Sequence, residues 1–330
     1  MKAVVLVGGE GTRLRPLTYF TPKQMLPVAG RPVIERVVEH LARHGVDEVV
    51  LSLGYKPDAF IAAYPDGHCG GVKLRYAVEA SPLDTAGAIA FAASQAGITS
   101  ETFLVVNGDV LTDIDIGALV RFHQDRGGEG SIALTPVEDP SLFGVVPVDA
   151  SGRVQAFIEK PPVGQAPTNM INAGIYVLEP TFLERVPVGK RVSVEREVFP
   201  ALVGAGSLYA LGSDALWTDM GTPGKYLEAN LVWARREVGG GAGGSGVLGV
   251  ANSVLHDGVF IEDGAHVRDA VLLEGAQVKK DAFVHGSVLG RDVVVGVGAI
   301  VRDLSVLGDG WVVEAGDTLS GARLPAEPAA

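Results

Sequence analysis

A glycine-rich segment near the N-terminus carries the residue types that hold phosphate groups. It follows the apolar run 3–7 and contains Gly8, Gly9 and Gly11. Glycines after a buried strand permit a tight turn that exposes backbone N–H groups to an anion. The basic residues that follow are Arg13, Arg15 and Lys23. Together these features predict a loop that binds a phosphorylated ligand.

Two common phosphate motifs do not fit this segment. The pattern G-x-x-x-x-G-K-[ST] is absent, and a dinucleotide fingerprint would need glycine at position 14, which is Leu14. The glycines alone would also suit an ordinary strand-to-helix turn. The continuation TRLRPLT at 12–18, followed by Pro22 and Lys23, favours the phosphate-binding interpretation.

The stretch LVGGEGTRLRPLTYFTPK at 6–23 resembles the signature of the sugar-1-phosphate nucleotidyltransferases. These enzymes join a sugar 1-phosphate to a nucleoside triphosphate and release pyrophosphate. Within the family, LVGG at 6–9 and VSVEREVFP at 192–200 are most similar to the guanylyltransferases that act on mannose 1-phosphate. The resemblance implies nucleotide contacts at Leu6, Gly8, Gly9, Gly11, Thr12, Glu79, Thr85 and Gly87, and catalytic roles for Arg13, Lys23, Asp109 and Lys160.

Two aspartates are candidate metal ligands. Asp109 follows the apolar run 102–106, and Asp219 lies in WTDMGTP at 217–223. Mg²⁺ prefers one or two carboxylates together with phosphate oxygens and water. The resemblance implies that Asp109 and Asp219 bind Mg²⁺ as the cofactor, whereas an isolated Asn-Gly-Asp could equally stabilise a turn.

The sequence FIEKP at 157–161 ends a predicted strand with an acid and a base. An exposed Glu-Lys pair alone would contribute little. The resemblance implies that the sugar phosphate contacts Gly144, Glu159, Lys160, Asn172 and Glu195. Glu195 also fits the first turn of a helix capped by Ser193. Two positions depart from the family pattern: Asp84 replaces a usual glycine, and Gln24 replaces a frequent proline.

The elements that must position these residues alternate between strands and helices over the first 235 residues. This order predicts a Rossmann-like, doubly wound α/β sheet. Later strands, expected near 131–137, 143–148, 154–159 and 173–178, lie closer together and indicate antiparallel additions. We expect a catalytic domain at 1–236, a glycine-rich linker at 237–247 and a second domain at 248–330.

The C-terminal region has a different rhythm. Its apolar residues form three series with steps of 17 or 18 residues. The series are Ile261, Val278, Val295 and Val313; Val267, Val284, Val301 and Leu319; and Leu272, Leu289 and Val306. Three staggered series per period predict a left-handed β-helix of hexapeptide repeats. We expect its corners at Gly264, Gly275, Gly290, Gly296 and Gly308; a small β-sandwich would fit this period poorly.

The composition of the chain restricts the kinds of partner and the compartment that we expect. The net charge of −12 argues against nucleic-acid binding, and no apolar run is long enough to predict a membrane span. The single cysteine, Cys69, indicates a reducing cytoplasm. His40 and His44 lack a third zinc ligand, and we expect them on the surface. We expect the β-helix to form a homo-oligomer.

The preferred function uses GTP and mannose 1-phosphate, with the sugar phosphate oxygen attacking the α-phosphorus in line. One alternative is the same chemistry with UTP, dTTP or ATP and glucose 1-phosphate. Another is a non-catalytic relative that binds a nucleotide sugar. A third is an additional acyltransferase activity in the β-helix, where His266 and His285 are available.

Overall fold

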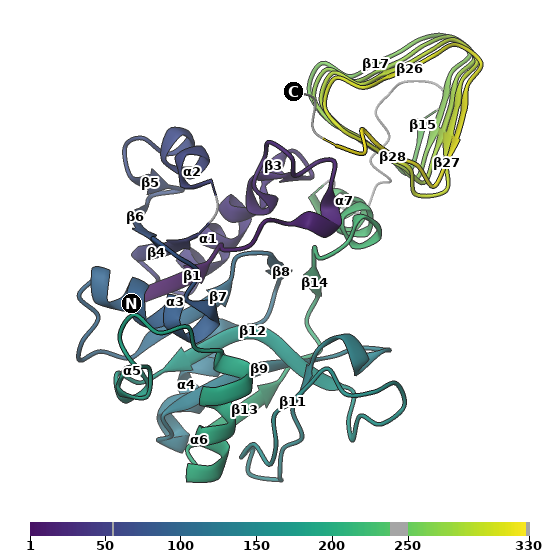
Figure 1. The fold of residues 1–330 in the computed structure, drawn as a ribbon. Helices are drawn as coiled ribbons and strands as arrows, with labels where there is room; N and C mark the ends of the chain where they lie inside the picture. The colour runs from purple at the N-terminus through teal and green to yellow at the C-terminus, as the bar shows by residue number, and fades with distance from the viewer. Residues whose placement is uncertain (55, 238–249, 328–330) are drawn as a thin grey trace. The chain divides into compact units, whose positions relative to one another are not determined.

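The computed structural model describes residues 1–54, 56–237 and 250–327, which form two compact units (Figure 1). The first unit comprises Met1–Gly9 and Ile34–Trp217, and the second comprises Glu10–Val33 and Thr218–Ala330. The predicted linker 237–247 lies, apart from Glu237, outside the described residues. The signature segment is therefore divided, because its first glycines belong to one unit and its cations to the other.

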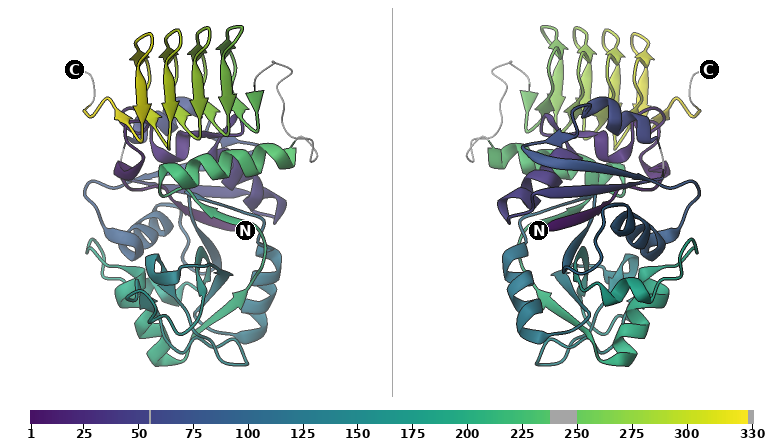
Figure 2. Two further views of the ribbon diagram at one scale, coloured as in Figure 1. Left: turned by 90° about the vertical axis from the view of Figure 1, so that its right-hand side faces the viewer. Right: turned by 90° about the vertical axis from the view of Figure 1, so that its left-hand side faces the viewer.

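The first unit is built on one mixed sheet (Figure 1, Figure 2). Its parallel strands are β7 (Phe103–Asn107), β1 (Lys2–Leu6), β4 (Glu48–Leu53) and β6 (Val72–Val78). Its further strands are β5 (His68–Cys69), β9 (Gly130–Pro136), β10 (Gly144–Val145), β11 (Ile158–Glu159), β12 (Met170–Leu178) and β13 (Leu208–Gly212). Strand β12 is antiparallel to β7, β9 and β10. The predicted parallel sheet with antiparallel additions is confirmed.

Two predicted strands are shorter than expected. The range 143–148 contains only the short strand β10, and the range 154–159 contains only β11. Outside these strands, the two ranges are connected by an isolated bridge between Val148 and Val154. Pro147 lies between β10 and this bridge. A proline has no N–H to donate to a neighbouring strand, so regular pairing ends there.

Helices and the short strand β8 (Val110–Thr112) complete the first unit. The helices are α1 (Val33–Arg43), α2 (Pro57–Ala63), α3 (Asp84–Gln95), α4 (Ile116–Arg126), α5 (Thr181–Glu184), the π-helix η4 (Val194–Val198) and α6 (Phe199–Ala205), with the 3-10 turn η3 (Pro140–Leu142). The apolar residues along one face of α1 are buried: Val33, Ile34, Val37, Val38 and Leu41. The main core lies between the sheet and helices α3, η4 and α6.

His40 and His44, which we expected on the surface, are half-buried. The Nε2 atom of His40 lies 3.0 Å from the Ile114 carbonyl oxygen, and the two imidazole rings meet edge to face at 4.9 Å. The backbone N–H of Gly117, in the first turn of α4, donates to Nδ1 of His44 over 3.3 Å. Burial, with a smaller contribution from the neighbouring His44, lowers the pKa of His40 to about 4.

Replacing His40 with glutamine should make the fold less sensitive to acid. Between pH 6.5 and about 4 the unfolded chain binds a proton at His40 that the folded chain does not, so stability falls as pH drops through this window. Between pH 7 and 5, we expect His40→Gln to lose about 1–2 kcal/mol less unfolding free energy than the parent. Denaturant titrations at both pH values would measure this. Equal losses in the parent and the variant would contradict the pKa assignment, and His68→Gln is the control at an exposed histidine.

The second unit contains the cationic part of the signature segment. Residues 10–33 form the 3-10 turns η1 (Thr12–Leu14) and η2 (Lys23–Met25) and the short strands β2 (Pro27–Val28) and β3 (Arg31–Pro32). The segment β14 (Trp217–Asp219) leads into α7 (Pro223–Glu237). Helix α7 holds this loop, since the Tyr226 hydroxyl donates to the Pro27 carbonyl over 2.6 Å and Ala29 N–H donates to Asn230 Oδ1 over 3.0 Å.

The rest of the second unit is a β-helix of three parallel sheets, stacked in register (Figure 2). One sheet contains β15 (Val250–Ala251), β18 (His266–Arg268), β21 (Phe283–His285), β24 (Ile300–Arg302) and β27 (Thr318–Ser320). The second contains β16 (Val254–Leu255), β19 (Val271–Leu272), β22 (Val288–Leu289), β25 (Val306–Leu307) and β28 (Arg323–Leu324). The third contains β17 (Phe260–Ile261), β20 (Gln277–Val278), β23 (Val294–Val295) and β26 (Val312–Val313).

The predicted apolar series fill the interior of this β-helix, with one correction. The first two series stack in the predicted register. In the third, Leu289 pairs with Leu307 and not with Val306. Leu304 is the extra residue of this coil, because Asp303 and Leu304 both have a positive φ where other coils have a single such residue.

The corners of the β-helix have left-handed backbone and are occupied by residues that tolerate it. Equivalent positions in successive coils are Asn252, Asp269, Gly286, Asp303 and Gly321; Gly258, Gly275, Asp292 and Gly310; and Gly264, Asp281, Gly298 and Gly316, all with positive φ. Glycine, asparagine and aspartate are the residues that adopt this conformation most readily. Of the five predicted corner glycines, Gly264 and Gly275 belong to these sets. Gly290, Gly296 and Gly308 do not have positive φ; they permit close contact with a neighbouring segment.

Replacing Asp281 with valine should destabilise the β-helix by about 1–2 kcal/mol, because a β-branched residue is strained at its φ of 58°. Calorimetry of the full chain would show a lower unfolding temperature for Asp281→Val and little change for Asp281→Gly. Lys280→Val, at the preceding exposed residue, is the matched control. Equal effects of the two valine substitutions would show that the left-handed corner carries no such cost.

Candidate functional site

The first group of candidate residues lies where the parallel strands end. Strands β1 and β7 are adjacent and parallel, so Leu6 pairs with Asn107 and the segments that follow leave the same edge of the sheet. Gly108 N–H donates to the Leu6 carbonyl over 2.8 Å, and a Cβ at Gly108 would lie 2.9 Å from that oxygen. Only glycine therefore permits this approach. It places Asp109 at the carboxyl edge, where open α/β sheets bind ligands.

Glu79 lies at the same edge, directly after β6. Its backbone N–H donates to the Leu53 carbonyl over 2.9 Å. Its carboxylate accepts hydrogen bonds from the Ser52 hydroxyl at 3.1 Å and from Leu83 N–H at 3.0 Å. These contacts fix the carboxylate between β4 and the start of α3.

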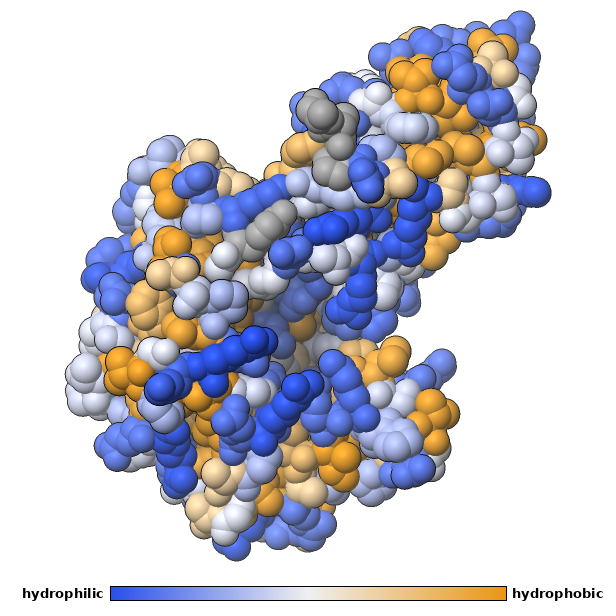
Figure 3. All heavy atoms as spheres, viewed as in Figure 1, coloured by the Kyte–Doolittle hydropathy of each residue, from blue (hydrophilic) through white to orange (hydrophobic). Residues whose placement is uncertain are grey.

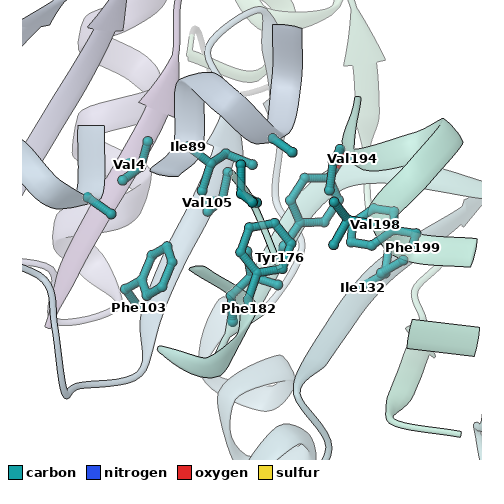
Figure 4. Packing of buried hydrophobic residues seen from close by; sticks show 14 of the residues in the cluster. Val4, Ile89, Phe103, Val105, Ile132, Tyr176, Phe182, Val194, Val198 and Phe199 are labelled. Carbon is teal, nitrogen blue, oxygen red and sulfur yellow. The ribbon is translucent and has the colours of Figure 1, made fainter. Parts of the chain in front are cut away.

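Three of the candidate acids lie near one buried tyrosine. Tyr176 rises from the core shown in Figure 4, where its ring meets Phe199 edge to face at 5.1 Å. Burial raises the pKa of the Tyr176 hydroxyl above its usual range, and the carboxylates of Glu195, Glu159 and Asp109 add to the rise. The structure thus brings together three acids that are far apart in the sequence.

Asn172 belongs to the same cluster. Its side-chain amide donates to the Tyr176 hydroxyl over 2.9 Å, and its Oδ1 atom accepts from Gly174 N–H over 2.9 Å. The register of β12 against β9 is irregular between Asn172 and Tyr176. This irregularity lets the two side chains, four residues apart, meet.

Gly144, Glu159 and Lys160 form a second part of the cluster. Gly144 pairs with Glu159 across β10 and β11, and a Cβ at Gly144 would lie 3.1 Å from Glu159 Oε2. Lys160 follows with a positive φ, and its ammonium group lies 3.4 Å from Glu159 Oε1. Its backbone N–H donates to the Phe143 carbonyl over 2.9 Å. A cation and an acid therefore extend from one short, anchored strand.

Thr85 and Ser193 hold Glu195. The Thr85 hydroxyl donates to Glu195 Oε2 over 2.7 Å and accepts from Val194 N–H over 2.8 Å. The Ser193 hydroxyl donates to the same carboxylate oxygen over 2.9 Å. Ser193 also caps η4, as the sequence predicted, by accepting from Arg196 N–H.

The departure at Asp84 has a local structural role. Asp84 adopts a φ of 60°, a left-handed conformation that glycine adopts without strain and that aspartate tolerates. Its carboxylate lies 3.5 Å from Arg191 Nε, and its Oδ1 accepts from Thr85 N–H over 2.9 Å. At Gly87, a Cβ would lie 2.7 Å from the Lys190 carbonyl oxygen, so only glycine fits beside the segment that carries Arg191.

The second group of candidates belongs to the second unit. Arg13 is exposed, and its guanidinium lies against Gly221, where a Cβ would approach Nη2 to 3.2 Å. Lys23 is buried, with its Cβ against Gly11. Asp219 forms an ion pair of 2.7 Å with Lys225. Within the described ranges, no cluster of three or more histidine, cysteine or acidic side chains has metal-binding geometry.

The candidate residues thus form two groups, one in each unit. The first unit holds Leu6, Gly8, Gly9, Glu79, Thr85, Gly87, Asp109, Gly144, Glu159, Lys160, Asn172 and Glu195. The second holds Gly11, Thr12, Arg13, Lys23 and Asp219. Sequence reasoning missed Tyr176 and Ser52, which look like ordinary strand residues, and Lys225, whose only signal is its position six residues after Asp219.

Two family models cover most of the chain. The nucleotidyl transferase model matches residues 2–235, and the model described as the GMPPB C-terminal domain matches residues 244–325.

Related sequences are named mannose-1-phosphate guanylyltransferase. A mannose-1-phosphate guanylyltransferase of Mycobacterium tuberculosis is 40% identical, over 95% of this chain and 81% of its own length. Mannose-1-phosphate guanylyltransferase 1 of Arabidopsis thaliana is 34% identical, over 94% of this chain and 91% of its own. Among solved structures, HddC from Yersinia pseudotuberculosis complexed with GMP-PN has a TM-score of 0.61 and 31% identity, covering 70% of this chain and 99% of that one.

The hydrogen bonds of Thr85 allow a test of whether Glu195 binds the sugar. Thr85→Val removes the donor to Glu195 and leaves Val194 N–H without its acceptor, so Glu195 should lose its fixed position. If Glu195 binds the sugar, the KM for the sugar 1-phosphate should rise about tenfold while the KM for the triphosphate stays within about twofold. Steady-state kinetics with each substrate varied would measure both, with Thr85→Ser as the control that keeps the hydroxyl. A rise in the triphosphate KM alone would instead support a direct nucleotide contact at Thr85.

Proposed function

This chain belongs to the nucleotidyl transferase family and is a sugar-1-phosphate nucleotidyltransferase, and we propose that it joins GTP to mannose 1-phosphate, giving GDP-mannose and pyrophosphate. The names of the relatives, and the guanine nucleotide analogue in the HddC structure, support this pair of substrates. The observation that carries the proposal is that Asp109, Glu159 and Glu195 all lie near enough to the Tyr176 hydroxyl to raise its pKa, in the unit where the glycine-rich loop begins.

The transfer itself forms one bond and breaks one. A phosphate oxygen of mannose 1-phosphate attacks the α-phosphorus of GTP in line, and the bond from the α-phosphorus to the oxygen bridging to the β-phosphorus breaks. In such reactions the protein mainly positions the reactants and stabilises charge. We assign Arg13 and Lys23 to the triphosphate and its pyrophosphate leaving group, and Lys160 to the phosphate of the sugar.

In our proposal the sugar and the base contact different residues. Glu159, Asn172 and Glu195 would accept or donate hydrogen bonds to sugar hydroxyls, with the backbone of Gly144 beside them. The anchored contacts of these residues support this, since a pre-positioned polar group loses little entropy on binding. Glu79 would receive the base, and Leu6, Gly8, Gly9, Gly11, Thr12 and Gly87 would border the nucleotide.

Enzymes of this family generally use a divalent metal, and we propose Mg²⁺ held by Asp109 and Asp219. Two carboxylates completed by phosphate oxygens and water suit Mg²⁺, and the donor set of this pair fits it. The metal would offset the negative charge of the triphosphate. Lys225, which lies 2.7 Å from Asp219 Oδ1, would compete with the metal for this carboxylate.

We also propose that the enzyme works in the cytoplasm and self-associates through its β-helix. Apolar side chains lie on the β-helix surface, orange in Figure 3, and include Phe260 at 56% exposure and Val312 at 52%. Their burial between copies would be favourable. In the portion of the chain that the structure describes, no helix could cross a membrane.

The proposal predicts the highest kcat/KM with GTP and mannose 1-phosphate. Pyrophosphate release measured with GTP, UTP, dTTP and ATP, each against mannose and glucose 1-phosphate, would test it. Asp109→Asn should lower kcat by about 100-fold or more, because an amide cannot replace the charge of the carboxylate toward the metal. Asp214→Asn, at an exposed aspartate, is the control. Turnover with another pair but not with GTP would overturn the substrate assignment and leave the transferase class intact.

A further inference from the structure

The cationic loop of the second unit lies along one corner of the β-helix. This corner follows strands β22, β25 and β28, which stack in one sheet. The Arg291 guanidinium, on the first of these corners, donates to the Thr21 hydroxyl over 3.3 Å. On the last, the Tyr19 hydroxyl donates to the Ala326 carbonyl oxygen. Two residues of the loop are therefore attached to coils that are more than 250 positions away in the sequence.

Pro16 packs at the middle of the same corner. A Cβ at Gly308 would lie 3.0 Å from Cβ of Pro16 and 3.1 Å from Cδ of Pro325. Any side chain at position 308 would therefore push against the loop. Gly308 has no positive φ, so local backbone conformation does not require glycine. The absence of a side chain here allows the loop and the coil to be in contact.

The most direct contact is at the catalytic candidate Arg13 itself. Within η1 and the turn after it, the carbonyls of Gly11, Thr12 and Leu14 accept backbone hydrogen bonds from the loop. Among the described hydrogen bonds, the carbonyl of Arg13 accepts from Arg323 Nη1 over 2.9 Å. Arg323 lies in β28, the last strand of the β-helix. The last coil thus satisfies the backbone oxygen that the loop's own turns do not use.

The side chain of Arg13 also has a close neighbour, Gly221. Its guanidinium lies on Gly221, at the start of the segment that leads into α7. The backbone of Arg13 is held at its carbonyl, and its side chain lies against a residue without Cβ. Neighbouring Arg15 is different, because its guanidinium pairs with Glu10 at 3.0 Å. The hydrogen bond from Arg323 is therefore made to Arg13, the arginine within η1, and not to Arg15.

We propose that Arg323 is a positioning residue for the transfer reaction, which fixes the main chain of Arg13 so that its guanidinium can reach the triphosphate. This inference rests on the proposed function of Arg13. It gives the β-helix a direct task in its own chain: the last coil completes the phosphate-binding loop. Removing the contact should affect the triphosphate and not the sugar phosphate, because the sugar-phosphate candidates belong to the first unit.

The test compares Arg323→Ala with Arg323→Lys and with Arg302→Ala in the full chain. Arg302 is an exposed arginine of the same β-helix whose Nε lies 3.4 Å from its neighbour Asp303. We expect Arg323→Ala to raise the KM for the triphosphate and lower kcat/KM about tenfold or more, since small displacements of a positioning group are costly. The KM for the sugar 1-phosphate should stay within about twofold. Arg323→Lys, which keeps a donor, should recover part of the loss, and Arg302→Ala should behave as the parent.

Hydrogen exchange provides a readout that does not depend on activity. In Arg323→Ala the amides of residues 12–19 should exchange faster than in the parent, with unchanged exchange in the strands of the β-helix. This effect should appear whichever substrate the enzyme uses, so it separates failure of the positioning role from failure of the proposed function. Parent-like exchange at 12–19, or an equal rise in both KM values, would overturn the proposal.

Discussion

The site in the first unit depends on one irregularity in strand β12. Gly174, with a φ of 75°, lies where a Cβ would come within 2.6 Å of Asn107 Nδ2, so only glycine can occupy it. Bulges of this kind re-aim side chains and often border active sites. Here the irregularity lets Asn172 bond both to Gly174 N–H and to the Tyr176 hydroxyl. Because β12 also pairs with β7 and β10, the same strand connects the segments that carry Asp109 and Glu159.

Tyr176 connects this arrangement to the stability of the unit. Its ring is part of the core, whereas its hydroxyl faces Asn172 and lies near three carboxylates. A neutral hydroxyl there offers a hydrogen-bonding group among like charges without adding another charge. The carboxylates of Glu79 and Glu195 are fixed in a similar way by the short hydroxyl side chains of Ser52, Thr85 and Ser193. The acids are therefore held before any ligand arrives, which lowers the entropy that binding must overcome.

The second unit has a different organisation. Its β-helix is held in shape by apolar stacking inside and by left-handed corners outside. Two segments from elsewhere in the chain pack along it: the cationic loop and α7. The extra residue Leu304 shows how the repeat adapts, since its side chain comes within van der Waals reach of a Cβ at Gly224, in the first turn of α7. A regular scaffold thus presents an irregular edge where it meets α7.

The sequence by itself determined the two architectures and the chemical class. The alternation of strand and helix signals predicted the α/β sheet, and the steps of 17 or 18 residues predicted the coils of the β-helix. Both patterns follow from which side chains must be buried. The glycine-rich loop and its cations predicted a phosphate ligand through residue types and spacing. The motifs around Asp109, Glu159 and Asn172 were assigned through their resemblance to the sugar-1-phosphate nucleotidyltransferases.

Only the tertiary structure decided how those residues are held. That Thr85 bonds to Glu195, that Tyr176 lies near three acids and that Arg323 reaches the carbonyl of Arg13 are contacts between positions 17 to 310 residues apart. The partial burial of His40 and the one-residue shift at Leu304 likewise came from packing. Such contacts leave no local pattern in the chain, because a hydrogen bond between distant residues depends on the path of the backbone and not on neighbours in sequence.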